Sequence, residues 1–465
     1  MTTEDWQAHL SNIEQLARAQ GLKYHPVEFE VVPESFMTEI AIYGLPVRMP
    51  HWSFGVRYIY QLIQHRMGLS RLFEVVFPGN PGRAYLAKSN SAAENVLVAA
   101  HVLGHADFST NNLLFRRSQA QVGEHIVEQA AAHARQIGVA IQEHGIQRVE
   151  SVLDAALSLE QHIDVDSGLR RERYPEITPD RAPLSSDEFS LRFAALGPDT
   201  ARPQSSGGGQ VKRAPIPPHP EKDLLWFIAQ YAPEMEPWER DIFLAVREES
   251  FYFYPVFACQ IMNEGWASYW HARLLREADF LPQASYVDAI KCHSDVVRPT
   301  ASGDNVSLST NPYHLGFSIW EKIVEAHGLE HARKIMCEDD DFGFVRNHLT
   351  LELATELKLF RYKGPATGTL TVQDVDLSAL HDALLAPKYG FGAPTVSAAR
   401  VHVDGKLELV HDHITDGRGL DPERGRRVLE YIARVWRRQV ALTTVDNDGR
   451  TVEVAVSPGE EMRLE

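Results

Sequence analysis

The apolar residues of this chain recur mostly at helical spacing. Residues 91–108 form a run of small and branched apolar residues long enough for a buried helix, and residues 237–280 are densely apolar and aromatic. Pro255 interrupts the second stretch, and because a proline removes a helical hydrogen bond, we expect two helices that meet near Tyr254. Residues 45–85 are aromatic but broken by proline and glycine, which predicts irregular structure between short helices.

The pattern changes from helical to alternating after about residue 394. Apolar and polar residues alternate over 401–409 around a predicted turn at Asp404 and Gly405, which is typical of a β-hairpin. A helical pattern then begins after Asp421, and a second hairpin pattern follows it. We therefore predict a small C-terminal α+β domain over 394–465, with the order β-β-α-β-β.

Composition supports one large domain beside this smaller one. The chain has 465 residues, 44% of them hydrophobic, which is enough for one large domain and a smaller one, and the helical spacing predicts a mainly α main domain over residues 1–385. A segment rich in proline, glycine and serine, 197–223, predicts a long exposed loop. The formal charge of −17 argues against nucleic acid as a partner, and no apolar run is long enough for membrane insertion. Three cysteines without CxxC spacing favour a cytoplasmic location.

Two histidines in the first predicted helix are candidates for chemistry. His101 and His105 are four positions apart, so on a helix both imidazoles project from one face, as a shared metal requires. Spacing alone is a weak signal, because His327 and His331 have the same spacing in a charged stretch typical of a solvated surface. The first pair is flanked by apolar residues instead. That setting predicts burial, and buried imidazoles need partners.

The stretch NEGWASYWH offers such partners. Glu264 and His271 are seven positions apart, which at roughly 100° per residue returns them to one helical face. If they meet His101 and His105, the four form a His3Glu set suited to zinc, iron or manganese. Four protein ligands would close the site, whereas three would leave a position for a polarised water and hydrolytic chemistry. The alternative is a hydrogen-bonded core network without a metal.

Several long motifs stand in order along the chain: KSNSAAENVLVAAHVLGHADFSTNN, PEKDLLWFIAQYAPEMEPWERDIFLAVREESFYFYP, IMNEGWASYWH, CHSDVVRP and NPYHLGF. Together they resemble the stage V sporulation protein R (SpoVR) family, and the resemblance runs from about residue 5 to the end. It implies a bacterial cytoplasmic protein linked to spore cortex formation or to stress and stationary-phase physiology. It also implies two partners, a PrkA-type serine kinase and a YeaH/YhbH-type protein.

The resemblance also suggests which residues hold the metal. A His-x-x-x-His pair followed by NEGWA is similar in layout to gluzincin peptidases, whose third zinc ligand is a glutamate on a later helix. The resemblance implies zinc bound by His101, His105 and Glu264, with His271 as a fourth ligand or a proton carrier. The positions that match the family's motifs are His101, His105, Asn112, Glu249, Glu264, His271 and His293.

One position departs from the peptidase pattern. Val102 stands where those enzymes place the glutamate that activates water. Hydrolysis would therefore need a carboxylate from another helix, and Glu249 is the candidate. Asp107, just past His105, is expected to orient a histidine ring as a hydrogen-bond acceptor.

Two functional hypotheses stay open. In the first, the chain is a metal-dependent hydrolase acting on cell-envelope or peptide-like substrates. In the second, it is a non-enzymatic assembly or regulatory factor that works with the kinase, and the same histidines and glutamate form a structural network. Metal content separates the two hypotheses.

Overall fold

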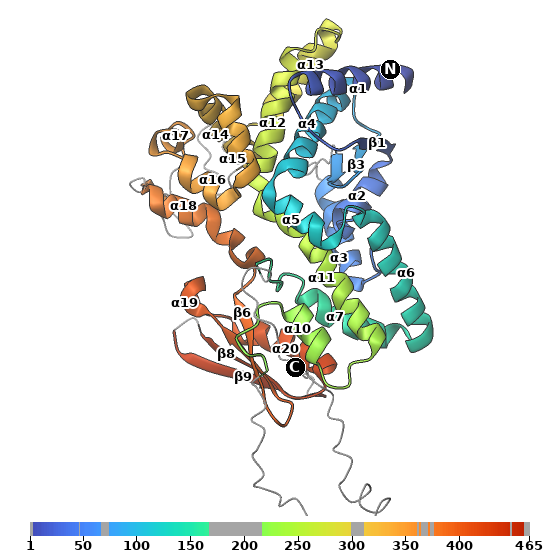
Figure 1. Ribbon diagram of the computed structural model, residues 1–465, viewed down its shortest axis with the longest axis vertical. Helices are drawn as coiled ribbons and strands as arrows, with labels where there is room; N and C mark the ends of the chain where they lie inside the picture. The colour runs from blue at the N-terminus through green and yellow to red at the C-terminus, as the bar shows by residue number, and fades with distance from the viewer. Residues whose placement is uncertain are drawn as a thin grey trace, which may run out of the picture.

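Three long helices form the centre of the molecule: α4 (Ala92–Asn111), α12 (Gln260–Arg276) and α14 (Pro312–His327). α12 lies between the other two and packs against both. In Figure 1 other helices lie beside and below this centre, and a four-stranded sheet lies at the lower end. The computed structural model thus confirms the predicted mainly α domain with a small C-terminal α+β domain. It describes residues 3–45, 47–66, 74–166, 216–298, 311–359, 362–363, 371–372, 376–446 and 449–459.

The central helices approach so closely that only glycine fits at their crossings. A Cβ atom built on Gly104 of α4 would lie 2.7 Å from the Cα of Ala267. A Cβ on Gly265 would lie 2.3 Å from the carbonyl carbon of Gly316, and one on Gly316 would lie 2.1 Å from the backbone oxygen of Ile261. The backbones of α4, α12 and α14 are therefore in contact. The side chains that neighbour these glycines in the sequence, such as His105 beside Gly104 and Glu264 beside Gly265, are therefore brought close together.

The helix before α12 does not break where the sequence predicts. α11 (Pro237–Ala258) continues through Pro255, and Cys259 separates it from α12, so the predicted junction near Tyr254 is wrong by one turn. Pro255 lies in the last turn, where its carbonyl still accepts from the N–H of Cys259. The first turn of α12 is held by Asp341, which accepts two backbone N–H bonds at 2.9 and 2.8 Å.

A three-stranded sheet covers one end of α4. Its central strand β3 (Gly82–Ala87) pairs parallel with β1 (Val27–Val32) and antiparallel with β2 (Glu74–Phe77). The predicted irregular structure over 45–85 is therefore wrong, since that range contains β2, β3 and the helix α3 (Trp52–Arg66). β3 is buried on both faces, so it lacks the alternation that would have identified it. β2 contacts α4 directly.

The C-terminal unit has the predicted order β-β-α-β-β. Its strands β6 (Val396–Val401), β7 (Leu407–His411), β8 (Val440–Val445) and β9 (Thr451–Val456) lie side by side in that order. The outer pairs are antiparallel hairpins, and β7 pairs parallel with β8. The helix α20 (Pro422–Trp436) makes the crossover between them.

The C-terminal unit shares a hydrophobic core with the helical body. Leu409 of β7 and Trp436 of α20 belong to the same buried cluster as Leu153 and Phe243. The predicted loop 197–223 ends against this unit: 197–215 lie outside the described residues, and Glu221 donates its backbone N–H to Ala398 at 2.9 Å.

Within the described ranges, no helix combines the length and apolar character that crossing a bilayer requires.

The remaining elements complete the described part of the chain. These elements are α1 (Thr3–Ala19), α2 (Glu34–Tyr43), α5 (Leu113–Val122), α6 (Ile126–His144), α7 (Ile146–Ser158), α10 (Leu224–Tyr231), α13 (Gln283–Val296), α15 (Leu329–Glu338), α16 (Asp341–His348), α17 (Leu351–Glu356), β4 (Tyr362–Lys363), β5 (Thr371–Val372), α18 (Leu377–Leu385), the 3-10 segment η1 (Ala386–Gly392) and α19 (His413–Asp416).

Candidate metal centre

Two imidazoles of α4 and one carboxylate of α12 meet beside the glycine crossing. One donor atom each from His101, His105 and Glu264 lies within 4.8 Å of the others. The Nε2 atoms of both histidines are 3.4 Å from Glu264 Oε2. The Glu264 side chain is 20% exposed, whereas that of His101 is 3% exposed, so the cluster opens to solvent at the carboxylate. Two imidazoles and a carboxylate that reaches solvent are the donor set of a three-ligand metal site.

Asn263 fixes the orientation of His105. Its Oδ1 lies 2.9 Å from His105 Nδ1. Because an amide oxygen can only accept, His105 carries a proton on Nδ1, so Nε2, which lies on the Glu264 side, is the nitrogen that could bind a metal once it is deprotonated. This is the outer hydrogen bond that metal-binding histidines usually make. The sequence analysis missed this role, although Asn263 stands directly before Glu264 in the quoted motif.

A row of imidazoles extends behind His101. His101 Nδ1 lies 2.9 Å from His271 Nδ1, and His271 Nε2 lies 2.6 Å from Nδ1 of His293. The sequence predicts His271 as a fourth ligand or a proton carrier. In the structure it is the hydrogen-bond partner of His101 and is not among the three candidate ligands His101, His105 and Glu264. Burial lowers the pKa of His271 well below its usual 6.5, and burial followed by the nearby His105 lowers the pKa of His101 to about 4. Both rings are neutral at pH 7.

His105 and Glu264 form the charged part of the cluster. Burial is the largest single effect and disfavours the charged form of His105, but the charge of Glu264 together with hydrogen bonds to Glu264 and Asn263 outweighs it and raises the pKa of this histidine. Burial likewise opposes ionisation of Glu264, yet His105 and His101 outweigh it and lower the pKa of the carboxyl group. Without a cation, both pKa shifts favour the charged pair, an imidazolium beside a carboxylate. A divalent cation bound here would release the extra proton of His105.

Two further polar groups face this cluster, and the sequence analysis identified neither. The Tyr313 ring is stacked on His101 with centroids 5.9 Å apart, and its hydroxyl donates to Glu264. The charge of Glu264, then burial, raises the Tyr313 pKa well above 10. Glu74 is the first residue of β2 and lies close enough to Glu264 to interact with its charge. Burial, and then the charge of Glu264, raise the pKa of Glu74 to about 7. Tyr313 stands in the NPYHLGF motif, whereas Glu74 carries no sequence signal.

The structure does not bring Glu249 to the cluster. The Glu249 side chain is fully buried on α11, where Oε2 accepts from Arg48 Nε at 2.6 Å and Oε1 lies 3.6 Å from His133 Nδ1. Val102 is fully buried in the hydrophobic core, so its position could not present a base to the metal. If a carboxylate activates water here, it comes from a different element.

Two other predicted residues have structural roles. Asp107 does not contact a histidine: it accepts from Trp266 Nε1 at 3.0 Å and from the backbone N–H of Lys23 at 2.7 Å. The expectation that Asp107 orients a histidine ring is therefore wrong. Asn112 caps the start of α5 by accepting from Leu114 N, and it donates to the backbone oxygen of Met336. Both residues fasten α4 to its neighbours.

Comparison with known proteins agrees with the helical fold and the quoted motifs. A family model described as SpoVR like protein matches residues 1–385, and the chain therefore belongs to this family. The chain is also similar to "Uncharacterized protein YcgB" of Escherichia coli (strain K12), with 27% identity over 488 residues, which cover 95% of this chain and 92% of that relative. No solved structure matches.

Removing the Asn263 amide is expected to weaken metal binding. In Asn263→Ala, His105 loses the acceptor that fixes its tautomer, and affinity for Zn²⁺ should fall by about 10–100-fold. Competition with a chromogenic chelator measures the change. Gln260→Ala, an exposed position on the same helix, is the control and should bind as the parent does. Equal affinities of all three proteins would contradict the role given to Asn263.

Proposed function

We propose that this SpoVR-family protein is a metal-dependent hydrolase whose ion is held by His101, His105 and Glu264. One observation supports this most strongly: the three donor atoms lie within 4.8 Å of one another where the carboxylate reaches solvent. Two imidazoles and one carboxylate are the donors of His2Glu zinc hydrolases. When bound, such an ion polarises a carbonyl group and lowers the pKa of water. We infer substrates of the peptide or cell-envelope class.

Glu74 is the carboxylate that takes the place of the missing base. Burial, and then the charge of Glu264, raise its pKa to about 7, and a bound cation would lower that pKa again, so Glu74 would be ionised and able to accept a proton. It approaches the cluster from β2, whereas the position after the first histidine, Val102, is buried in the core. In this proposal the Glu74 carboxylate removes a proton from the attacking water.

Tyr313 and His271 complete the proposed machinery. The Tyr313 hydroxyl keeps its proton because its pKa is raised, and by turning from Glu264 it would donate its hydrogen bond to negative charge that develops on a substrate oxygen. His271 fixes the ring of His101 through the contact at 2.9 Å, which makes it a positioning residue.

A Glu74→Gln variant tests the proposal. The zinc-loaded parent is expected to cleave fluorogenic peptides or peptidoglycan fragments, and Glu74→Gln to retain its metal while the rate falls by about 10²-fold or more. Rates and metal content are measured on the same preparations. Glu30→Gln, an exposed glutamate on strand β1 of the same sheet, is the matched control and should keep the parent's rate.

The result also separates the two hypotheses that the sequence left open. A metal-loaded parent that cleaves neither substrate class would reject the hydrolase and leave the ion a structural role, as in an assembly or regulatory factor. A rate unchanged in Glu74→Gln would remove Glu74 from the mechanism and keep the hydrolase.

A further inference from the structure

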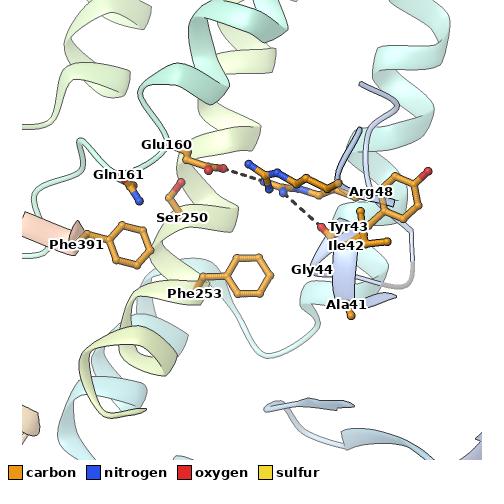
Figure 2. A pocket seen from close by; sticks show the side chains of 11 residues that line it. Ala41, Ile42, Tyr43, Gly44, Arg48, Glu160, Gln161, Ser250, Phe253 and Phe391 are labelled. Carbon is orange, nitrogen blue, oxygen red and sulfur yellow. Dashed lines mark hydrogen bonds and ion pairs between the residues drawn. The ribbon is translucent and has the colours of Figure 1, made fainter. Parts of the chain in front are cut away.

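A pocket of about 240 Å³ lies between the end of α2, the residues after α7, and α11 (Figure 2). None of the residues that line it belongs to the metal cluster. Its lining divides into three chemical kinds: two guanidinium groups, a set of hydrogen-bond acceptors, and two phenyl rings. Each kind matches one part of a small ligand.

The first wall of the pocket carries two guanidinium groups, and because Glu249 neutralises the charge of Arg48, the uncompensated positive charge is that of Arg57. The Arg48 side chain is only 7% exposed and is fixed by its 2.6 Å bond to the buried Glu249. Its other contacts are loose, at 3.4 Å to the backbone oxygen of Tyr43 and 3.5 Å to Glu160, and Figure 2 shows both as dashed lines. Arg57 lines the same pocket and has no carboxylate at ion-pair distance among the described residues. Two guanidinium groups with N–H bonds to spare suit a carboxylate.

The second wall accepts hydrogen bonds. The Glu160 carboxylate is 30% exposed and lines the pocket next to Gln161. Ser250 donates its hydroxyl hydrogen to the backbone oxygen of Val246 at 2.8 Å, so the lone pairs of its oxygen remain free to accept. A carboxylate and a hydroxyl oxygen together suit an ammonium group, which can only donate.

The third wall is aromatic. The Phe253 and Phe391 rings both line the pocket, as Figure 2 shows. Phe391 has φ +60°, a left-handed conformation that costs energy in a residue with a side chain, and its ring packs on Phe257 with centroids 5.0 Å apart. Such strain is often kept where a side chain must occupy a functional position.

We propose that this pocket binds a free α-amino acid with an apolar or aromatic side chain, as its zwitterion. The carboxylate binds between Arg48 and Arg57, the ammonium group binds Glu160 and Ser250, and the side chain packs on the Phe253 ring. The pocket is smaller than the about 300–1,000 Å³ that drug-sized ligands occupy, which favours a single amino acid over a longer peptide. The proposal is independent of the metal cluster and goes beyond the hydrolase.

Three related compounds test the proposal by titration calorimetry on the full chain. L-phenylalanine is expected to bind, whereas N-acetyl-L-phenylalanine lacks the ammonium group and L-phenylalaninamide lacks the carboxylate. Each analogue should bind about tenfold more weakly, because each loses a charge-assisted hydrogen bond. Absence of L-phenylalanine binding at millimolar concentration, or equal affinity for all three compounds, would overturn the proposal.

Two variants assign the charges to residues. Arg57→Gln should remove the preference for phenylalanine over its amide, and Glu160→Gln should remove the preference over the N-acetyl compound. Both side chains are partly or fully exposed, so neither change should disturb folding. Arg424→Gln, at an exposed position on α20, is the control and should leave all three affinities unchanged. Preferences that survive in both pocket variants would refute the assignment.

Discussion

If the proposed metal centre is correct, a His105→Ala variant is expected to purify with less than about one tenth of the divalent metal of the parent chain, since two of the three proposed ligands would remain. Glu264→Gln should lose metal as well, because an amide oxygen cannot supply the negative charge of the carboxylate. Elemental analysis of untagged protein measures both. Circular dichroism on the same samples shows whether the variants keep their helices, which separates loss of the ion from loss of the fold.

The chain supplies its own control for this experiment. His327 and His331 repeat the spacing of the candidate ligands, and their rings are 5.0 Å apart, but a turn at Gly328 places them on two helices. His331→Ala should therefore keep the parent's metal content. A folded parent that contains no metal after zinc is added would reject the metal centre outright.

A Gly316→Ala variant is expected to destabilise the whole protein by about 3 kcal/mol or more, because overpacking a tight contact forces the backbone to move. The new Cβ would lie 2.1 Å from the backbone oxygen of Ile261, and a helical backbone cannot yield as a flexible side chain can. Urea unfolding followed by circular dichroism measures the loss. Since Glu264 follows Ile261 by one turn, the variant should also hold metal less tightly.

Gly138→Ala is the matched control for this substitution. Gly138 also lies inside a helix, α6, but a Cβ there would meet nothing within 4 Å. Alanine should stabilise that helix by up to about 1 kcal/mol, since it loses less backbone entropy on folding. If Gly316→Ala were as stable as the parent, α12 and α14 would not be in backbone contact.

Helical periodicity accounts for what the sequence could predict. The spacing of His101 and His105 fixes their common face whatever surrounds the helix, and the same rule applies to Glu264. These side chains meet because small residues lie where α4 and α12 cross, so that the two backbones come into contact. Gly104 and Gly265 stand directly beside the candidate ligands, and this close packing was not recognised in the sequence.

The groups that the sequence did not reveal depend on long-range contacts. Glu74 reaches the cluster because β2 pairs with β3, and a four-residue strand buried against a helix has no pattern of its own. Asn263 and Tyr313 lie in recognised motifs, but only the packing of α12 against α4 and α14 shows which group each one contacts. In the sequence Glu249 looked equally suitable as the base, but its carboxylate is buried away from the cluster, where Arg48 neutralises its charge.

The hydrophobic core that β7 and α20 share with the helical body has a consequence for how the chain folds. The family model ends at residue 385, which suggests a natural place to divide the chain. Leu409 and Trp436 lie beyond that point, yet they are fully or almost fully buried in the same cluster as Leu153 and Phe243. Because they share this core, we expect the C-terminal unit and these helices to unfold together. The end of the family match at residue 385 is therefore not a boundary between two separate cores.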